Sequence, residues 1–419
     1  MIRPTVARVD LAAIESNLLA IAQFLSGART SHLEPRASDL DAPRSTHPDA
    51  PRTPHPAPRI IAVVKANAYG HGAADVALAL ERAGAAMLAC ADIEEGIVLR
   101  RAGVRAPILV FGALGISDLD GVFEYDLTPT ISTPTAAQNL EAAARHRLGS
   151  DTGQPRVRPG SDPGLTPPRR AKLRCHLKID TGMNRLGFRH DNLGRTLPAI
   201  ANSEYLAIDA VYTHFATADE PEHPAFALQR ERFEHVLATL PSLGIHPQWR
   251  HAANSAALLR DERVWYDFVR PGLLLYGIVP PPLAATIALR PALSLHSRIV
   301  HVKGLRPGEG TGYGLRSVAD SPRTIAVVPA GYADGLDRRM AGHAFMLVRG
   351  KRVPVVGSVC MDMTMIDVTG MEVSTGDEVV IVGRQGGEEI GMREIAAAIG
   401  TIPYELLCRV GTRIERIYD

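Results

Sequence analysis

The chain has 419 residues, enough for two or three domains with large hydrophobic cores. Its 46 lysine and arginine residues nearly balance its 45 aspartate and glutamate residues, and the formal charge is +1. The sequence therefore carries no electrostatic footprint for nucleic acid or an anionic membrane surface, and we expect a small-molecule ligand.

The cysteines and the start of the chain exclude further classes of protein. The four cysteines are far apart and form no C-x-x-C pair, so they predict neither a metal site nor a disulfide framework: Cys90, Cys175, Cys360 and Cys408. The first residues lack an apolar run of signal-peptide length, and the most apolar stretch is interrupted by Glu81 and Arg82. We expect a cytoplasmic protein without a membrane span.

Near the start, an amphipathic helix is predicted behind the N-cap residue Asp10, because Ile14, Leu18, Ile21 and Leu25 recur at helical spacing. Residues 1–12 are expected to contain a strand that joins a later β domain.

Two proline-rich stretches, about 27–58 and 147–171, contain almost no large apolar residues and are predicted to be disordered insertions. Each lies between a helix and the next strand, which places it opposite the active-site face of the barrel described below. Deleting residues 28–57 should therefore leave turnover largely intact. His47 and His55 lie in the first insertion, but without a fixed scaffold they do not predict a metal site.

Between and after the insertions, short apolar strands alternate with helical segments. Alternation of this kind implies parallel strands joined by right-handed crossovers, and eight such units favour a closed (β/α)8 barrel over residues 13–285. The predicted strands are 60–64, 86–91, 107–111, 127–131, 172–179, 207–213, 246–250 and 266–269. Residues 92–103 illustrate a predicted helix, in which Asp92 and Glu95 form a capping box.

After about residue 285 the pattern changes to alternating strands separated by glycine turns, as in FMLVRGKRVPVVGS at 345–358. Residues 286–419 are therefore predicted to form a second, mainly β domain.

Polar residues and glycines follow several barrel strands, where a barrel of this kind has its active site. Lys65 follows the first strand, and the others follow the fifth to the eighth: Arg185, His214, Asn254, Ser255, Arg270, Gly272 and Leu273. A partly desolvated lysine at a strand end has a pKa lowered from about 10.4, so its free amine can attack a carbonyl group. The alternative is a lysine whose stem packs while its ammonium group reaches solvent.

Ser255 and Gly272 suggest a phosphate site, because barrel enzymes often bind phosphate with the loops after strands seven and eight. Ser255 alone would more often be a simple helix N-cap.

Seven motifs in order resemble the alanine racemase family and cover both predicted domains: AVVKANAYGHG, KIDTGMNRLGF, HAANSAA, RPGLLLYG, GYADG, VCMDMTMIDVT and PYELLC. The resemblance implies a head-to-tail homodimer that holds pyridoxal phosphate on Lys65 as an imine. It implies a phosphate grip by Tyr69, Ser255, Tyr404, Gly272 and Leu273. Arg270 would face the pyridine nitrogen with His251 behind it, and His214 would lie against the ring.

The same resemblance places Arg185 at the phenolic oxygen and the substrate carboxylate. Tyr313 and Met361 would come from the partner subunit, and Tyr332 and Asp362 would complete the substrate mouth. A carbamate on Lys178 would orient Arg185, with a plain exposed lysine as the alternative.

The implied activity is racemisation of alanine, supplying D-alanine for peptidoglycan. Lys65 would exchange the α-proton on one face of the substrate, and Tyr313 would exchange it on the other. The alternative is that Tyr313 only lines the wall of the site. An arginine cannot give up its proton, so Arg270 would leave the cofactor ring a weaker electron sink and disfavour transamination. Without the resemblance, an arginine at this place would more often be an ion-pair partner. Alternative functions are a broader amino-acid racemase, a barrel-type decarboxylase and a non-catalytic pyridoxal-phosphate carrier.

Overall fold

The computed structural model describes residues 4–30, 57–114, 116, 118–149, 172–284 and 287–419. Most of the two predicted insertions lies outside these residues. Their edges do not: helix α1 (Leu11–Thr30) and helix α6 (Pro134–Gly149) both extend into the ranges predicted to be disordered. The deletion that spares α1 is therefore 31–56 rather than 28–57.

The first sheet closes into a barrel of eight parallel strands, as predicted. The strand order is β5-β4-β3-β2-β10-β9-β8-β6, and β5 pairs with β6 to close the ring, while the two-residue strand β7 (Phe188–Arg189) adds to β6. The barrel strands are β2 (Arg59–Val63), β3 (Met87–Cys90), β4 (Ile108–Val110), β5 (Thr128–Ile131), β6 (Leu173–Asp180), β8 (Leu206–Tyr212), β9 (Trp249–Asn254) and β10 (Phe268–Arg270).

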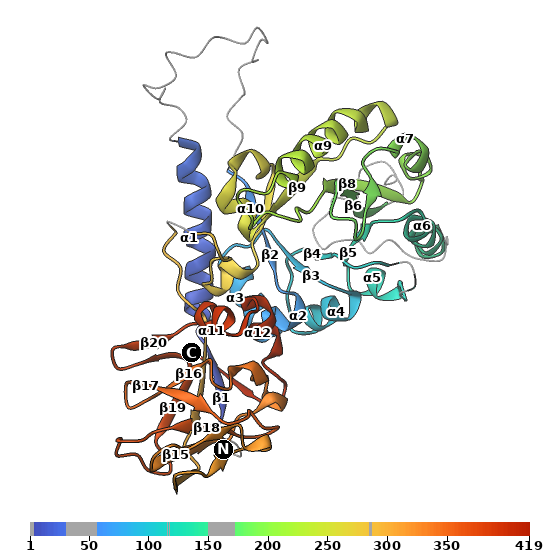
Figure 1. Cartoon of the computed structure of the whole chain (residues 1–419). Helices are drawn as coiled ribbons and strands as arrows, with labels where there is room; N and C mark the ends of the chain where they lie inside the picture. The colour runs from blue at the N-terminus through green and yellow to red at the C-terminus, as the bar shows by residue number, and fades with distance from the viewer. Residues whose placement is uncertain (1–3, 31–56, 115, 117, 150–171, 285–286) are drawn as a thin grey trace, which may run out of the picture.

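Helices surround the barrel on its outer side (Figure 1). Besides α1 and α6 they are α3 (Ala73–Arg82), α4 (Ile93–Arg101), α5 (Asp120–Glu124), α7 (Leu193–Thr196), α8 (Pro198–Ala201), α9 (Ala225–Thr239) and α10 (Ser255–Arg260). The predicted cap of α1 is present, since the Asp10 carboxylate accepts a hydrogen bond from the Ala13 amide at 2.7 Å.

The seventh strand begins and ends later than the sequence predicts. It begins at Trp249 and continues to Asn254, whereas the sequence had suggested 246–250. Pro247 has no amide to donate to a sheet, and the strand instead uses Ala252 and Ala253, which are fully buried. Small alanines at a tightly packed position show no strand periodicity, so the pattern did not reveal them.

The second domain contains most of a ten-stranded sheet with the order β12-β15-β18-β17-β16-β19-β11-β1-β21, and β20 pairs with β19. Its strands are β11 (Leu293–Arg298), β12 (His301–Leu305), β15 (Arg323–Val328), β16 (Phe345–Val348), β17 (Lys351–Val356), β18 (Thr364–Asp367), β19 (Glu378–Gln385), β20 (Glu388–Ile390) and β21 (Glu415–Tyr418). Strands β13 (Gly310–Thr311) and β14 (Ser317–Val318) form a separate ribbon.

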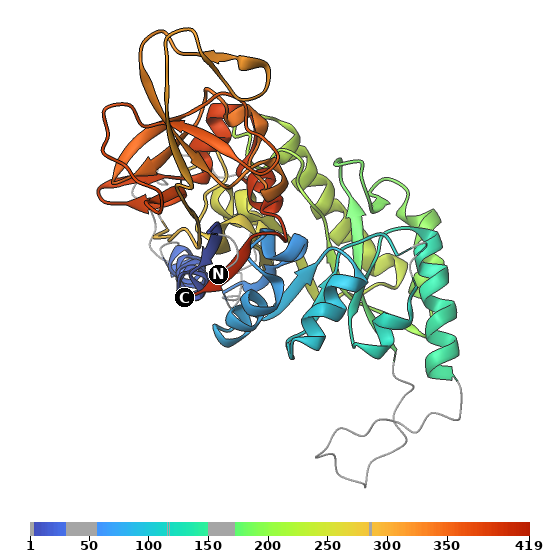
Figure 2. The same cartoon turned by 90° about the horizontal axis from the view of Figure 1, so that it is seen from below.

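The two ends of the chain meet in this sheet. Strand β1 (Val6–Val9) pairs with β11 on one side and with the C-terminal strand β21 on the other, so both termini lie together (Figure 2). Helices α11 (Met392–Ile399) and α12 (Pro403–Arg409) lie at the junction with the barrel (Figure 1), where α12 packs against the segment that follows Lys65. Among the described residues, no helix combines the length and apolar character needed to cross a membrane.

Candidate active site

The chain makes an unusual turn directly after strand β2. Lys65 opens the short element α2 (Lys65–Tyr69), in which Ala66, Asn67, Ala68 and Tyr69 all have φ between 51° and 54°. Each non-glycine residue in the left-handed region costs roughly 1–2 kcal/mol, so four in succession need strong support from their surroundings.

Several contacts provide that support. The Glu95 carboxylate in α4 accepts hydrogen bonds from the amides of Ala66 at 2.7 Å and Ala91 at 2.8 Å. The Asn67 side chain accepts from the Ala73 amide at 2.8 Å, at the start of α3. The predicted capping box is therefore only half correct. Asp92 accepts from the Glu95 amide, but the Glu95 side chain fastens the Lys65 turn instead of returning to Asp92.

The surroundings of Lys65 favour its uncharged form. Burial lowers the pKa of Lys65 from its ordinary value, and the positive charge of Arg185 lowers it further. The thiol of Cys408 and the Glu95 carboxylate oppose this shift in pKa, but they are the smaller influences. These surroundings favour a lysine whose free amine attacks a carbonyl group over a lysine whose ammonium group reaches solvent.

A cradle of donors lies beside this lysine, at the ends of β9 and β10. The Ser255 hydroxyl accepts a hydrogen bond from the Gly272 amide at 2.9 Å. Ser255 is therefore not the N-cap of α10. The N-cap is Asn254, because its side chain accepts a hydrogen bond from the Ala257 amide. The Leu273 amide has no hydrogen-bond partner among the described residues. A Cβ at Gly272 would lie 2.5 Å from the Tyr69 hydroxyl, so only glycine fits here.

Tyr404 completes this cradle from the second domain. Its ring centroid lies 5.8 Å from that of Tyr69, and α12 holds it against the Lys65 turn. The cradle thus combines two phenol hydroxyls, a serine hydroxyl and a backbone amide, a donor set that suits a phosphate group.

Arg270 is buried inside the barrel and is not an ion-pair partner of any described carboxylate. It donates to His251 Nδ1 at 2.8 Å and to the carbonyl oxygens of Thr213 and Ala252, each at 2.8 Å. Its contact with His214 Nδ1 is 3.2 Å long. Burial lowers the pKa of Arg270 only to about 10, so the side chain is a cation at neutral pH.

Lys178 is only 6% exposed, so the plain exposed lysine considered from the sequence is wrong. Burial, followed by the charges of Arg185 and Arg270, lowers the pKa of Lys178 to about 8. Burial and the charge of Arg270 also hold the pKa of His214 well below 6.5, so this imidazole is neutral.

Arg185 lies on the barrel, in the segment between β6 and β7. Besides Tyr404, four predicted site residues lie on the second domain: Tyr313, Tyr332, Met361 and Asp362. Tyr313 is 77% exposed and Met361 is 52% exposed, and both line a hollow of about 600 Å³ with Asp362. Tyr332 donates its amide to the Cys360 carbonyl, and Asp362 pairs with Arg413 at 2.7 Å. Among the described residues of one chain, no hydrogen bond or ring contact joins Tyr313 to Lys65.

Comparison with known proteins agrees with this geometry. Residues 49–280 match the family model of the alanine racemase N-terminal domain, and residues 292–418 match that of its C-terminal domain. The chain belongs to the alanine racemase family. It is an isomerase, and its reaction is the racemisation of alanine, as the sequence predicted.

Individual members of the family are similar over almost the whole chain. The alanine racemase of Symbiobacterium thermophilum is 39% identical over 418 residues, covering 99% of this chain and 97% of that protein. The alanine racemase structure from a D-cycloserine-producing Streptomyces lavendulae aligns with a TM-score of 0.84 and 33% identity, covering 100% of this chain and 98% of that chain. The structure of the Bacillus anthracis alanine racemase with bound L-Ala-P aligns with a TM-score of 0.80 and 35% identity, covering 100% of this chain and 96% of that chain.

Three residues near this alanine racemase site escaped the sequence reasoning. Glu95 fastens the Lys65 turn. Gln229 in α9 donates to the Thr181 hydroxyl at 3.2 Å and the His214 carbonyl at 3.0 Å, and so links two loops of the site. His176 contacts His251 inside the barrel. Its spacing of two from Lys178 on β6 was the available signal, because such residues face the same side of a strand.

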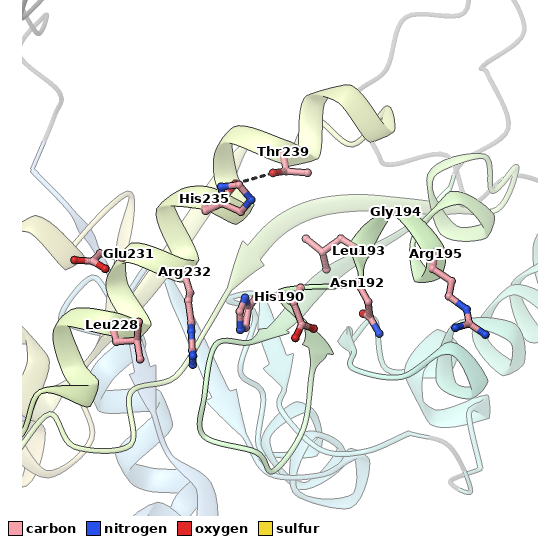
Figure 3. A pocket seen from close by; sticks show the side chains of 11 residues that line it. His190, Asn192, Leu193, Gly194, Arg195, Leu228, Glu231, Arg232, His235 and Thr239 are labelled. Atoms are coloured by element: carbon pink, nitrogen blue, oxygen red, sulfur yellow. Dashed lines mark hydrogen bonds between the residues drawn. The ribbon is translucent and has the colours of Figure 1, made fainter. Parts of the chain in front are cut away.

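A larger hollow of about 780 Å³ lies elsewhere, on the outer side of the barrel between α9 and the segment before α7 (Figure 3). His190 and Arg232 face one another across it, but Arg232 already donates to the Thr181 carbonyl at 2.9 Å. None of the predicted alanine racemase site residues lines this hollow.

Proposed function

We propose that the chain racemises alanine with pyridoxal phosphate and two proton-exchanging groups, Lys65 and the Tyr313 of a second copy of the chain. The observation that carries this proposal is the arrangement around Lys65: a desolvated amine beside a phosphate-type cradle and a buried arginine. Pyridoxal phosphate, when bound to the amino group of the substrate, withdraws electrons from the α-carbon and makes its proton acidic.

The chain offers a suitable holder for each part of this cofactor. Tyr69, Ser255, Gly272, Leu273 and Tyr404 would hold the phosphate. Arg270 would donate a hydrogen bond to the pyridine nitrogen, and since a guanidinium group does not release its proton, that nitrogen would stay unprotonated. The neutral His214 lies beside Arg270, where it can contact the ring.

Lys65 and Tyr313 would share the proton transfers. The uncharged Nζ of Lys65 removes the α-proton on one face of the substrate, and the Tyr313 hydroxyl delivers a proton on the other; the opposite direction reverses these roles. Arg185 would pair with the substrate carboxylate and keep the α-carbon between the two groups.

The position of Tyr313 supports a homodimer as part of the proposal. Exposed apolar side chains gather around it on the second domain, which is unusual for a surface that faces water: Leu315, Val318, Met361 and Met363. Since Tyr313 does not contact Lys65 within one chain, we propose that this surface covers the barrel of a second copy, with Met361, Asp362 and Tyr332 at the substrate mouth.

The proposal also gives Lys178 a role. The lowered pKa of Lys178 allows its free amine to take up carbon dioxide, giving a carbamate and a proton, and the new negative charge would orient Arg185.

We place the enzyme in the cytoplasm, where it would supply D-alanine for peptidoglycan.

The test is the Tyr313→Phe variant of the cofactor-loaded enzyme in deuterated water. Racemisation should fall by roughly 10²- to 10⁴-fold, because one proton-exchanging group is lost. Exchange of the α-proton should survive for one enantiomer, which Lys65 still reaches. Tyr125→Phe, at a tyrosine that bonds Arg101 on the barrel surface, is the control and should behave as wild type. Equal exchange from both enantiomers in Tyr313→Phe would contradict the proposal.

A further inference from the structure

Three side chains form a continuous hydrogen-bonded series inside the barrel. Arg270 NH1 lies 2.8 Å from His251 Nδ1, and His251 Nε2 lies 3.1 Å from His176 Nδ1. All three side chains are buried. They come from three strands, β10, β9 and β6, so the series crosses the interior of the barrel.

The position of every proton in this series follows from its first member. A guanidinium group only donates, so His251 Nδ1 accepts from Arg270 and carries no proton. The proton of neutral His251 is then on Nε2, which donates to His176 Nδ1. The proton of neutral His176 is in turn on its Nε2, which has no hydrogen-bond partner among the described residues.

Both imidazoles are neutral. Burial and the charge of Arg270 hold the pKa of His251 well below 6.5, and burial lowers the pKa of His176 to about 4. Each ring therefore has one donor and one acceptor. The direction of donation runs from Arg270 through His251 to His176.

We propose that His176 is a positioning residue for the racemase reaction: by accepting the His251 Nε2 proton it fixes the plane of that imidazole, and thereby the guanidinium of Arg270. This inference rests on the proposed function, because it matters for the chemistry only where Arg270 faces the pyridine nitrogen. The NH2 group of Arg270 contacts two carbonyl oxygens and His214 Nδ1, and His251 is the only acceptor of its NH1 group among the described side chains.

A purely structural role for His176 predicts something different. The imidazole would then only fill the barrel interior, and a side chain of similar volume without an acceptor would replace it with a loss of stability alone. His176→Leu provides that replacement. His176→Asn keeps an acceptor near the Nδ1 position, since the two atoms are at the same distance along the side chain.

The first measurement is nitrogen and proton NMR of the histidine rings in the full chain without cofactor. His176 and His251 should both carry their proton on Nε2. His71 is an internal contrast, because its Nδ1 lies 3.0 Å from two carbonyl oxygens and must carry the proton. The His251 Nε2 proton should be protected from exchange in wild type and His176→Asn, and should lose protection at least tenfold in His176→Leu.

The second measurement is the side reaction of the cofactor-loaded enzyme, in which alanine and pyridoxal phosphate exchange an amino group for a carbonyl oxygen and yield pyruvate and pyridoxamine phosphate. A misplaced Arg270 should raise pyruvate formed per racemisation event several-fold in His176→Leu, and His176→Asn should restore the wild-type ratio. Cys175→Ala is a neighbouring buried change on the same strand, at a thiol that donates to the Leu173 carbonyl and not to any of the three side chains, and it should alter stability but not the ratio.

Arg270→Lys separates the two levels of the proposal. If Arg270→Lys raises the pyruvate ratio while His176→Leu leaves both the ratio and the His251 protection unchanged, the role of His176 is wrong and the proposed function stands. If neither variant changes the ratio, both the role of His176 and that of Arg270 are wrong.

Discussion

Two influences lower the pKa of Lys65 in the same direction. Burial and Arg185 lower its pKa, so the free amine becomes available below the ordinary value of 10.5. The rate at which the protein without cofactor attaches pyridoxal phosphate should rise with pH and level off before that value. Arg185→Gln removes one cause and should move the midpoint to higher pH, as followed by absorbance. Arg189→Gln, an exposed arginine paired with Asp191, should leave the midpoint in place.

Lys178 gives a second pH dependence, with a pKa of about 8. Below this pH the amine is protonated and cannot react with carbon dioxide, and above it the uncharged form dominates. With ¹³C-labelled bicarbonate, a carbamate signal in the NMR spectrum should therefore grow as pH rises through about 8. The signal should disappear in Lys178→Arg and persist in Lys172→Arg, whose lysine is exposed at the start of the same segment. A signal lost in both variants would contradict the assignment to Lys178.

At the scale of elements, the left-handed turn after Lys65 depends on helix α12. Gly70, which ends the turn with φ of 80°, is so close to α12 that a Cβ would lie 2.2 Å from the Leu407 carbonyl oxygen. Gly84 has φ of 95° and nothing within 4 Å of its Cβ position. Both Gly→Ala variants strain the backbone, but Gly70→Ala should lower the free energy of unfolding by about 1–3 kcal/mol more, as measured by denaturant titration.

The same comparison reports on the cofactor. Gly70→Ala should push α12 away and displace Tyr404, so we expect weaker binding of pyridoxal phosphate. Gly84→Ala should bind it as the wild type does. Equal binding by both variants would mean that α12 does not set the cradle.

The sequence predicted elements where local chemistry decides them and missed those that tertiary contacts impose. Apolar strands between polar helices predicted the barrel, and the spacing behind Asp10 predicted α1. The left-handed run Ala66–Tyr69 could not be predicted, because only Asn67 among its residues readily adopts that conformation and the hydrogen bond from Ala66 to Glu95 spans 29 residues of sequence. His176 was missed for the same reason, since its partner His251 lies on another strand.

At the scale of the whole molecule, the barrel and the β domain are joined by more than a linker. Strand β1 begins the chain within the β domain sheet, Tyr404 returns from that domain to the phosphate cradle, and Arg416 donates to the Gly70 carbonyl at 3.0 Å. These contacts fix one half of the site. Tyr313 is exposed on the same domain and has no hydrogen bond or ring contact with Lys65 among the described residues, so the other half must come from outside the chain if Tyr313 takes part.

This arrangement predicts that two inactive variants restore each other. Lys65→Ala and Tyr313→Phe should each lose racemisation when both subunits of a dimer carry the same substitution. In a mixed dimer, one site combines the intact Lys65 of one subunit with the intact Tyr313 of the other. Unfolding and refolding an equal mixture should therefore recover about a quarter of wild-type activity, because half of the dimers are mixed and each has one complete site of two. If Tyr313 acts within its own chain, no mixture recovers activity, since every site then carries one of the two substitutions. Refolding each variant alone controls for reversion and should give none.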